Sequence, residues 1–428
     1  MISIQRGGAF FIALVMCSTL FAQKAGFNYD ESKVPQFELP ALLVSADGTV
    51  VQSAEQWQTL RRPEVVSLFE QHVFGVAPQW HQPLRWRLRS DVECFDGKAR
   101  RREFTIFLSD KSSQPLELLI YTPTAATAPV PCFLGYNFHG NHSLEDDPTL
   151  HLTTSWVRND KGRDSRNNQA NDKGRGKSSG RWDVARIVGR GYGLATIYYG
   201  DVDPDFDDEF RNGLHSLTEA DRTDDQRAAD AGGSIAAWAW GLSRVLDVLE
   251  TDSLVDGKRV AVFGHSRLGK TSLWAGATDE RFAMVISNNS GCGGAALSRR
   301  RFGETVARIN TSFPHWFCRR HRDYNDNENA MPVDHHMLIA LAAPRPVYVA
   351  SAEGDRWADP RGEFLSLFHA GPVYELFGKS GLPDDSVATV DKPIHTDVGY
   401  HIRSGGHDVK PFDWVQYLNF ADQHLKTR

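Results

Sequence analysis

The pattern of hydrophobic and polar positions changes near residue 130. Before that point, three segments alternate apolar and polar residues, at 84–89, 102–108 and 116–121. Alternation places the apolar side chains on one face of a strand, so these segments predict antiparallel strands with one face in water. The preceding residues, 23–75, predict an extended segment that ends in a helix over 63–73.

After residue 130 the apolar runs are continuous. They occupy residues 130–136, 193–199, 260–263, 282–286 and 346–350. Such runs are typical of strands buried on both faces of a parallel sheet. Helical patterns separate them, at residues 221–250, 270–277 and 334–342. Antiparallel strands followed by strand–helix units predict an α/β class: a three-layer αβα sandwich around a mixed, mostly parallel sheet with an antiparallel N-terminal part.

A polar stretch interrupts this pattern between Trp156 and Trp182. It is rich in Arg, Asn, Asp, Lys and Gly and cannot supply a core, so it predicts a loop insertion at residues 156–182. Two interpretations stay open, a solvated insertion and a lid that faces a substrate. The sequence shows no internal repeat, and one domain over residues 23–428 accounts for the remainder.

The first 22 residues predict a cleaved signal peptide. Arg6 precedes an apolar stretch over residues 9–22, which is too short to span a bilayer, and we expect cleavage after Ala22. Cys17 is an alternative site of lipid attachment, although Met16 stands where a small residue is expected. No later segment is long and apolar enough to span a membrane, which predicts an exported protein, periplasmic or secreted.

Composition and charge narrow the partners. The 428 residues are 41% hydrophobic and 24% charged with a net charge of −6, which gives no reason to expect a nucleic acid or a membrane as partner. We expect no metal, since no Cys/His spacing suggests zinc, and we also expect no cofactor and a monomer.

In an oxidising compartment the cysteines after the signal peptide allow three pairings, among Cys94, Cys132, Cys292 and Cys318. Cys292 with Cys318 is the preferred pair because both fall in one segment, and two free buried cysteines are the alternative.

The segment 264–270, Gly-His-Ser-Arg-Leu-Gly-Lys, carries the most informative chemical signal. It lies between the apolar run 259–263 and a helical pattern, so Ser266 stands at the apex of a tight turn from strand to helix. In α/β-hydrolases such a turn exposes a nucleophilic serine, and the following helix points N–H groups at an oxyanion. The usual pattern is G-x-S-x-G, whereas Gly269 comes one residue late. An ordinary connection whose small residues permit close packing is the alternative.

A serine nucleophile needs a base, and the base needs a carboxylate. In this fold the chain order is serine, acid, histidine. Asp355 lies just past the strand 346–351 and is the preferred acid. Asp359 precedes a proline and can instead cap the next helix, and Glu353 can be solvated.

The base is chosen by context from sixteen histidines. His407 follows a glycine pair that lets a tight loop present the ring, and it is the preferred base. At least one of His335 and His336 is expected to be structural, because they fall at a helical pattern. The loop with His139 and His142 stands where this fold places a second oxyanion donor.

Together, these residues resemble carbohydrate esterase family 15, the glucuronoyl esterases, in its bacterial form. Residues 264–270 are similar to the family's G-x-S-R-x-G-K motif, which accounts for the late glycine. Residues 286–296, 340–346 and 357–360 also fit, and the resemblance extends from about Val34 to the C-terminus.

The resemblance implies roles for individual side chains. Ser266 would be the nucleophile, His407 the base, and Arg267 a stabiliser of the oxyanion. The residues implied to hold the uronic acid are Lys270, Glu304 and Trp357. Their chemistry suits a sugar, because a lysine donates to hydroxyls, a carboxylate accepts from them and an indole face stacks on the ring. The alternatives are a surface cation for Lys270, an ion-pair partner of nearby arginines for Glu304 and a core residue for Trp357.

The chain departs from the fungal pattern in two places. Asn289 stands where fungal members resemble Glu, and a neutral amide cannot supply the charge of the triad, which again favours Asp355. His265 and Asp408 stand where fungal members have cysteines beside the nucleophile and the base, so that bridge is absent.

The resemblance implies an exported serine esterase that hydrolyses the ester between (4-O-methyl-)glucuronic acid of glucuronoxylan and lignin alcohols. An acetyl xylan or feruloyl esterase is the first alternative. A non-catalytic, carbohydrate-binding hydrolase fold is the second.

Overall fold

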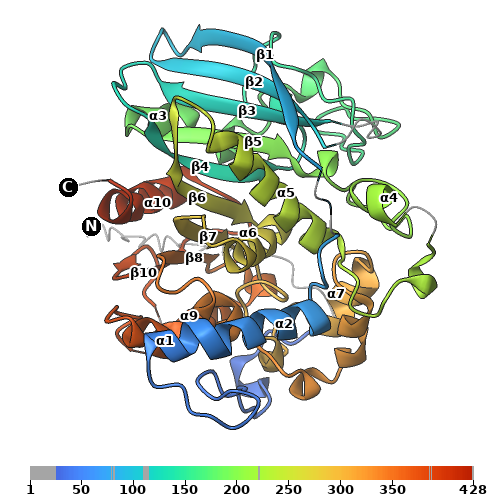
Figure 1. Ribbon diagram of the computed structural model, residues 1–428, viewed down its shortest axis with the longest axis vertical. Helices are drawn as coiled ribbons and strands as arrows, with labels where there is room; N and C mark the ends of the chain where they lie inside the picture. Colours follow the sequence, from blue (N-terminus) through green and yellow to red (C-terminus); the bar gives the residue numbers. More distant parts are fainter. Residues whose placement is uncertain are drawn as a thin grey trace, which may run out of the picture.

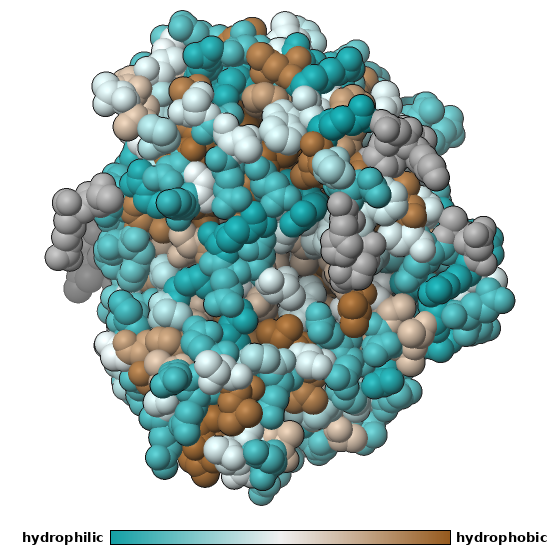
Figure 2. Space-filling model, viewed as in Figure 1, coloured by the Kyte–Doolittle hydropathy of each residue, from teal (hydrophilic) through white to brown (hydrophobic). Residues whose placement is uncertain are grey.

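The computed structural model describes residues 26–426 except 79, 81, 109–114, 220–221, 385 and 387. The predicted signal peptide, residues 1–22 with Cys17, therefore lies outside the described residues. The single domain over residues 23–428 stays a prediction. Among the described helices, none is long and apolar enough to cross a membrane. On the face seen in Figure 2, hydrophobic residues form small groups among hydrophilic ones.

Within the described residues, ten strands form one sheet in the order β1-β2-β3-β5-β4-β6-β7-β8-β10-β9 (Figure 1). Their bounds are β1 (Arg85–Cys94), β2 (Ala99–Phe107), β3 (Leu116–Pro123), β4 (Val130–Asn137), β5 (Gly193–Tyr198), β6 (Val255–His265), β7 (Met284–Asn288), β8 (Val347–Ala352), β9 (Ile394–His395) and β10 (Val398–Arg403). Strands β1, β2, β3 and β5 pair antiparallel, and all pairs from β5 to β10 are parallel. The predicted mixed, mostly parallel sheet with an antiparallel N-terminal part is confirmed.

The continuous apolar runs exist because these strands face two separate cores. On β6, Val260 and Val262 belong to one core and Ala261 and Phe263 to the other. Successive side chains on a strand point to opposite faces, so a strand that is covered on both faces must be apolar throughout.

Helices cover each face and complete the three layers (Figure 1). One core includes residues of α2 (Arg62–His72), α5 (Ser234–Leu249), α6 (Arg267–Thr278), α8 (His335–Ala340) and α9 (Pro360–Leu376). The other includes residues of α3 (Val184–Gly189) and α10 (Pro411–His424). The other α-helices of the described residues are α1 (Ala54–Gln56), α4 (His215–Thr218) and α7 (Val306–Ser312), of which α7 also contributes to the first core. The αβα sandwich predicted from the hydrophobic pattern is confirmed.

Two local predictions were wrong. The helix expected over 221–250 begins only at Ser234, because the preceding backbone bonds elsewhere: Gly232 N donates to Val76 O at 2.8 Å and Gly233 N to Phe74 O at 3.1 Å. Strands β2 and β3 do not have one face in water, and most of their residues are buried. Strand β1 is instead mostly exposed.

The preferred disulfide was also wrong. Cys94, Cys132, Cys292 and Cys318 are all free. The two cysteines of the preferred pair have different surroundings. Cys318 Sγ lies 3.9 Å from the carbonyl oxygen of Gln71, whereas the charges of Lys270 and Glu304 act on the thiol of Cys292. Closeness in sequence therefore did not bring the two sulfur atoms together.

The insertion at residues 156–182 is a loop, as predicted. It contains only isolated bridges and the 3-10 turns η4 (Asp172–Gly174) and η5 (Ser179–Arg181). It is not merely solvated, because Arg158 contacts the buried Asp205 and Arg181 contacts Asp408.

Candidate active site

Ser266 stands at a strained turn between β6 and α6. Its backbone has φ 59° and ψ −129°, a conformation that non-glycine residues rarely adopt. Ser266 N donates to Asn288 O at 2.8 Å, which fixes the turn to the end of β7. A Cβ at Gly264 would meet Leu268 O at 1.8 Å, so only glycine fits there. Gly269 packs close to Ser290, where a Cβ would lie 3.0 Å from the serine Cβ. The late glycine therefore lets the first turn of α6 approach the loop after β7.

His407 and Asp355 lie within hydrogen-bond distance, with Nδ1 and Oδ2 2.6 Å apart. They follow β10 and β8, which are parallel neighbours, so the carboxyl ends of both strands meet at one edge of the sheet. Two main-chain bonds join the loops, from Glu353 N to Arg403 O at 2.9 Å and from Gly354 N to Gly405 O at 2.8 Å. The Asp355 side chain is 5% exposed and that of His407 42% exposed. A buried carboxylate thus supports an accessible imidazole.

Asn289 also binds the carboxylate of Asp355. Its Nδ2 donates to Asp355 Oδ2 at 2.9 Å, and its own N–H donates to Ala350 O at 2.7 Å. Its φ of 47° lies in the left-handed region, which asparagine tolerates better than most residues. The sequence showed that Asn289 cannot supply a charge, but not that it contacts the acid.

His265 packs against His407, with ring centroids 4.5 Å apart. Its Nδ1 lies 2.6 Å from Asn288 Oδ1, and Asn288 Nδ2 donates to Tyr417 OH at 2.7 Å. Because the amide nitrogen donates to Tyr417, Oδ1 is left to accept the N–H of His265. Burial, together with His407, holds the pKa of His265 well below its usual value, so the ring is neutral.

Arg267 is the first residue of α6, and its Nη1 forms an ion pair with Asp205 Oδ2. Asp205 is fully buried and also accepts from Tyr199 OH at 2.9 Å, His315 Nε2 at 3.0 Å and Trp316 Nε1 at 2.8 Å. Burial alone would raise the pKa of Asp205, but Arg267 and these bonds outweigh it and hold the pKa well below its usual range. The Arg267 Cζ lies 4.8 Å from the centroid of the Trp316 ring. The guanidinium is therefore held by a carboxylate and an aromatic face.

The predicted sugar-binding residues lie on three segments. Lys270 is 3% exposed and its Nζ donates to Ser290 O, which overturns the surface-cation alternative. Burial lowers the pKa of Lys270, and the charge of Glu304 opposes that shift.

Glu304 N donates to Trp357 O at 3.0 Å, so the main chain brings these two residues together. Gly303 permits this approach, since a Cβ there would lie 2.5 Å from Trp357 O. Trp357 is half-buried and packs edge-to-face against Phe27.

The alternatives that the sequence offered for Asp359, Glu353 and the pair His335 and His336 agree with the structure. Asp359 caps α9 by accepting from Gly362 N, and Glu353 is exposed. His335 and His336 are both buried in α8, and burial lowers the pKa of each to about 4. Nowhere in the described part of the chain are three His, Cys, Asp or Glu side chains grouped as a metal ion needs.

Comparison with known proteins places this geometry in a family. A relative named carbohydrate esterase MZ0003, from an unknown prokaryotic organism, is 50% identical over 97% of this chain and 97% of its own length. A solved structure of a promiscuous CE15 esterase from a marine bacterial metagenome is also 50% identical, covers 93% of this chain and 100% of that chain, and has a TM-score of 0.86. The chain belongs to carbohydrate esterase family 15.

Two further matches agree with membership of family 15. The glucuronoyl esterase from Solibacter usitatus is 45% identical, covers 92% of this chain and 100% of that chain, and has a TM-score of 0.87. The family model for fungal glucuronyl esterases matches residues 226–378, which include the Ser266 turn and Asp355. This family 15 protein is therefore a carboxylic ester hydrolase with an α/β-hydrolase fold.

Sequence reasoning missed several residues around the site of this family 15 esterase: Asp205, Arg181, Arg403 and the contact from Asn289. Asp205 falls in the acidic run 201–208, which resembles a solvated loop. Arg181 falls in the insertion that the sequence describes only as polar. No local signal separates these residues from their charged neighbours.

Proposed function

We propose that this protein is an exported serine esterase that cleaves esters of (4-O-methyl-)glucuronic acid, those that join glucuronoxylan to lignin alcohols. The contact of 2.6 Å between His407 Nδ1 and Asp355 Oδ2, at the sheet edge that also carries the Ser266 turn, is the observation that best supports it. Several relatives of the fungal type are named 4-O-methyl-glucuronoyl methylesterases, among them one from Phanerochaete chrysosporium that is 36% identical over 34% of this chain and 33% of its own length.

The proposed reaction proceeds through an acyl-enzyme. Ser266 Oγ attacks the ester carbonyl of the uronate while His407 Nε2 takes the hydroxyl proton, and Asp355 stabilises the imidazolium. His407 then gives that proton to the departing alcohol, which leaves a glucuronoyl ester on Ser266. Water attacks this ester with His407 again as base, so glucuronic acid is released and Ser266 regains its proton.

The negative oxygen that forms during each attack needs donors. The first turn of α6 offers N–H groups without partners inside the helix, and the helix dipole favours negative charge at that end. Arg267 adds a cation whose orientation Asp205 fixes. Loss of one good oxyanion donor typically lowers the rate by roughly 10²–10³.

We assign recognition of the uronate to Lys270, Glu304 and Trp357. The contacts of Lys270 with Ser290 O and of Glu304 with the Trp357 main chain hold these residues in fixed places. Recognition of a sugar as the acyl part of the ester argues against an acetyl xylan or feruloyl esterase, because acetyl and feruloyl groups are not sugars. The acetyl alternative still has one observation in its favour, because a relative at 50% identity is described as promiscuous.

The test compares benzyl glucuronate with acetyl and feruloyl esters under the same conditions. We expect the highest kcat/KM on the glucuronate and no turnover by Ser266→Ala. A preference for acetyl or feruloyl esters would overturn the uronate assignment, and esterase activity retained by Ser266→Ala would overturn the mechanism. An inactive wild-type chain that still binds glucuronoxylan would favour the non-catalytic alternative.

Export is a separate part of the proposal and rests on the sequence of residues 1–22. N-terminal sequencing of the protein recovered from the periplasm or medium should begin at Gln23. A chain that begins at Cys17 and carries lipid would instead identify a lipoprotein.

A further inference from the structure

The loop that carries His407 is held from beneath by Arg403. Arg403 Nη1 donates to Ser404 O at 3.0 Å, and Nη2 donates to Gly406 O at 2.9 Å and to Asp408 O at 2.6 Å. One guanidinium thus binds carbonyl groups on both sides of His407.

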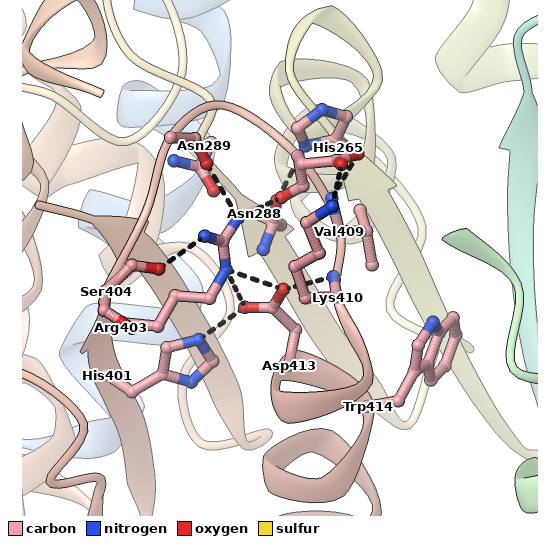
Figure 3. A network of polar contacts seen from close by, with 12 residues as sticks. His265, Asn288, Asn289, His401, Arg403, Ser404, Val409, Lys410, Asp413 and Trp414 are labelled. Atoms are coloured by element: carbon pink, nitrogen blue, oxygen red, sulfur yellow. Dashed lines mark hydrogen bonds and ion pairs between the residues drawn. The ribbon is translucent and has the colours of Figure 1, made fainter. Parts of the chain in front are cut away.

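Arg403 is itself fixed by the buried carboxylate of Asp413. Its Nε donates to both oxygens of Asp413, at 3.1 and 2.9 Å. Asp413 also lies 2.8 Å from His401 Nε2 and accepts from Lys410 N at 2.6 Å (Figure 3). Both Arg403 and Asp413 are buried, so water does not compete for the hydrogen bonds between them.

The other side of the loop is held by a residue of the polar insertion. Arg181 Nε donates to Asp408 Oδ1 at 2.6 Å, and Asp408 directly follows His407. The carbonyl oxygen of Arg181 accepts from Trp414 Nε1 at 2.8 Å, so its backbone is anchored on α10. The Arg181 Cζ also lies 5.9 Å from the centroid of the Phe138 ring, beyond the end of β4. Arg181 therefore connects three parts of the molecule at the loop of His407.

We propose that Arg181 is a positioning residue for His407, through which the insertion at residues 156–182 completes the active site. This inference rests on the proposed role of His407 as the base. Ser404, Gly405 and His407 are exposed, and glycine gives a loop wide conformational freedom. The carbonyl contacts of Arg403 hold the main chain of the loop, whereas Arg181 holds the side chain of Asp408, the residue that follows His407. Asp408 carries both contacts, one through its carbonyl and one through its carboxylate.

The test is a double-mutant cycle of Arg181→Gln and Asp408→Asn on the full chain. We expect each variant to lower kcat on benzyl glucuronate about tenfold with KM within about twofold, because small displacements of a catalytic group cost rate rather than ground-state binding. The double variant should be no slower than the slower single one, because both changes break one contact. The Tm should stay within about 2 °C, since a partly exposed ion pair adds little stability.

Two further variants separate positioning from a general charge effect. Arg186→Gln removes a matched pair, in which Arg186 Nε donates to Asp183 Oδ2 at 2.5 Å, and should leave kcat unchanged. Lys410→Gln removes the second cation on Asp408, 2.6 Å away, but Lys410 is two residues from Asp408 and cannot tie the loop to the insertion. We expect it to change kcat less than about twofold.

The dependence of kcat on salt concentration distinguishes positioning of His407 by Arg181 from a purely structural role of Arg181. The esterified uronate is uncharged, so salt does not screen its approach. About 1 M NaCl shortens the Debye length to about 3 Å and should lower kcat of the wild type but not of Arg181→Gln. Wild-type kcat in Arg181→Gln, or additive losses in the double variant, would overturn the inference. Because Ser266→Ala is assayed beside them, such a result is distinguishable from failure of the proposed mechanism.

Discussion

Asn289 Nδ2 donates to Asp355 Oδ2 at 2.9 Å, the same carboxylate oxygen that lies 2.6 Å from His407 Nδ1. One oxygen thus serves an amide and an imidazole. Asn289 Oδ1 is buried and has no hydrogen-bond partner among the described residues, so the amide serves the site only as a donor. Asn289, at the position where fungal members resemble Glu, therefore orients the carboxylate that we propose as the acid of the triad.

This arrangement predicts unequal losses for the two residues. Asp355→Asn removes the charge that stabilises the imidazolium and can favour the wrong tautomer, so kcat on benzyl glucuronate should fall by roughly 10⁴. Asn289→Ala removes one hydrogen bond to this carboxylate, worth about 1.5–3 kcal/mol, so kcat should fall by roughly 10- to 100-fold, which is far less than 10⁴. Steady-state kinetics with both variants measures the difference. Losses of similar size would reject Asp355 as the acid of the triad.

Asp205 should affect catalysis through Arg267. Asp205→Asn removes the anion that holds the guanidinium, so we expect a fall in kcat of about tenfold or more and a loss of stability of about 3–5 kcal/mol, because a buried charge loses its partner. If Arg267→Gln is already slow, adding Asp205→Asn should slow it little further. Kinetics on the folded fraction and urea unfolding measure the two effects.

Asp203 supplies the matched control for Asp205. It is also buried, but it accepts from Ser234 Oγ at 2.5 Å and lies 3.0 Å from His215 Nδ1. Asp203→Asn should therefore lower stability while kcat of the folded protein is retained. If both variants lose stability and neither loses kcat, Asp205 has no part in positioning Arg267.

The sequence predicted those features that are local or that follow from strand order. The continuous apolar run at 260–263, which lies in the buried part of β6, is a property of one segment, and the meeting of Asp355 and His407 follows from parallel neighbouring strands. Contacts between distant, irregular segments could not be predicted. Asp205 lies in an acidic run that resembles a solvated loop, yet it is fully buried. Its partners Arg267, His315 and Trp316 come from far along the chain. Arg181 has no local signal that separates it from the other arginines of the insertion.

The free cysteines give a prediction that corrects the expected disulfide. Burial raises the pKa of Cys94 and of Cys318 to about 11, and it raises those of Cys132 and Cys292 further. The thiolate is the reactive form, so native thiols should react slowly at pH 8. A mature chain that begins at Gln23 should show four thiols on titration in denaturant, and dithiothreitol should not change its Tm. Two titratable thiols, or a lower Tm on reduction, would restore the disulfide.

Glu363 on α9 gives the protein a pH-dependent stability. Its carboxyl is fully buried and accepts from Ser290 N at 2.7 Å, Gly291 N at 3.0 Å and Ser351 Oγ at 2.6 Å. Burial raises the pKa from 4.5 to about 8, although these bonds oppose the shift. Between these two values the folded state keeps a proton that the unfolded state has lost. The free energy of unfolding should therefore fall as pH rises through this window, by up to about 1.4 kcal/mol per pH unit, and level off on either side.

Glu363→Gln tests this directly, because an amide oxygen can still accept from Ser290 N and Gly291 N but carries no titrating proton. Urea unfolding at several pH values between 5 and 8 should show the contribution of Glu363 to the slope in the wild type and not in the variant. The difference in stability between the two proteins should change steadily in favour of the variant as pH rises. Glu353→Gln, at an exposed carboxyl two residues before Asp355, should follow the wild-type curve. If the Glu363→Gln and wild-type curves run parallel across this range, Glu363 is already ionised in the folded protein, and the three hydrogen bonds outweigh its burial.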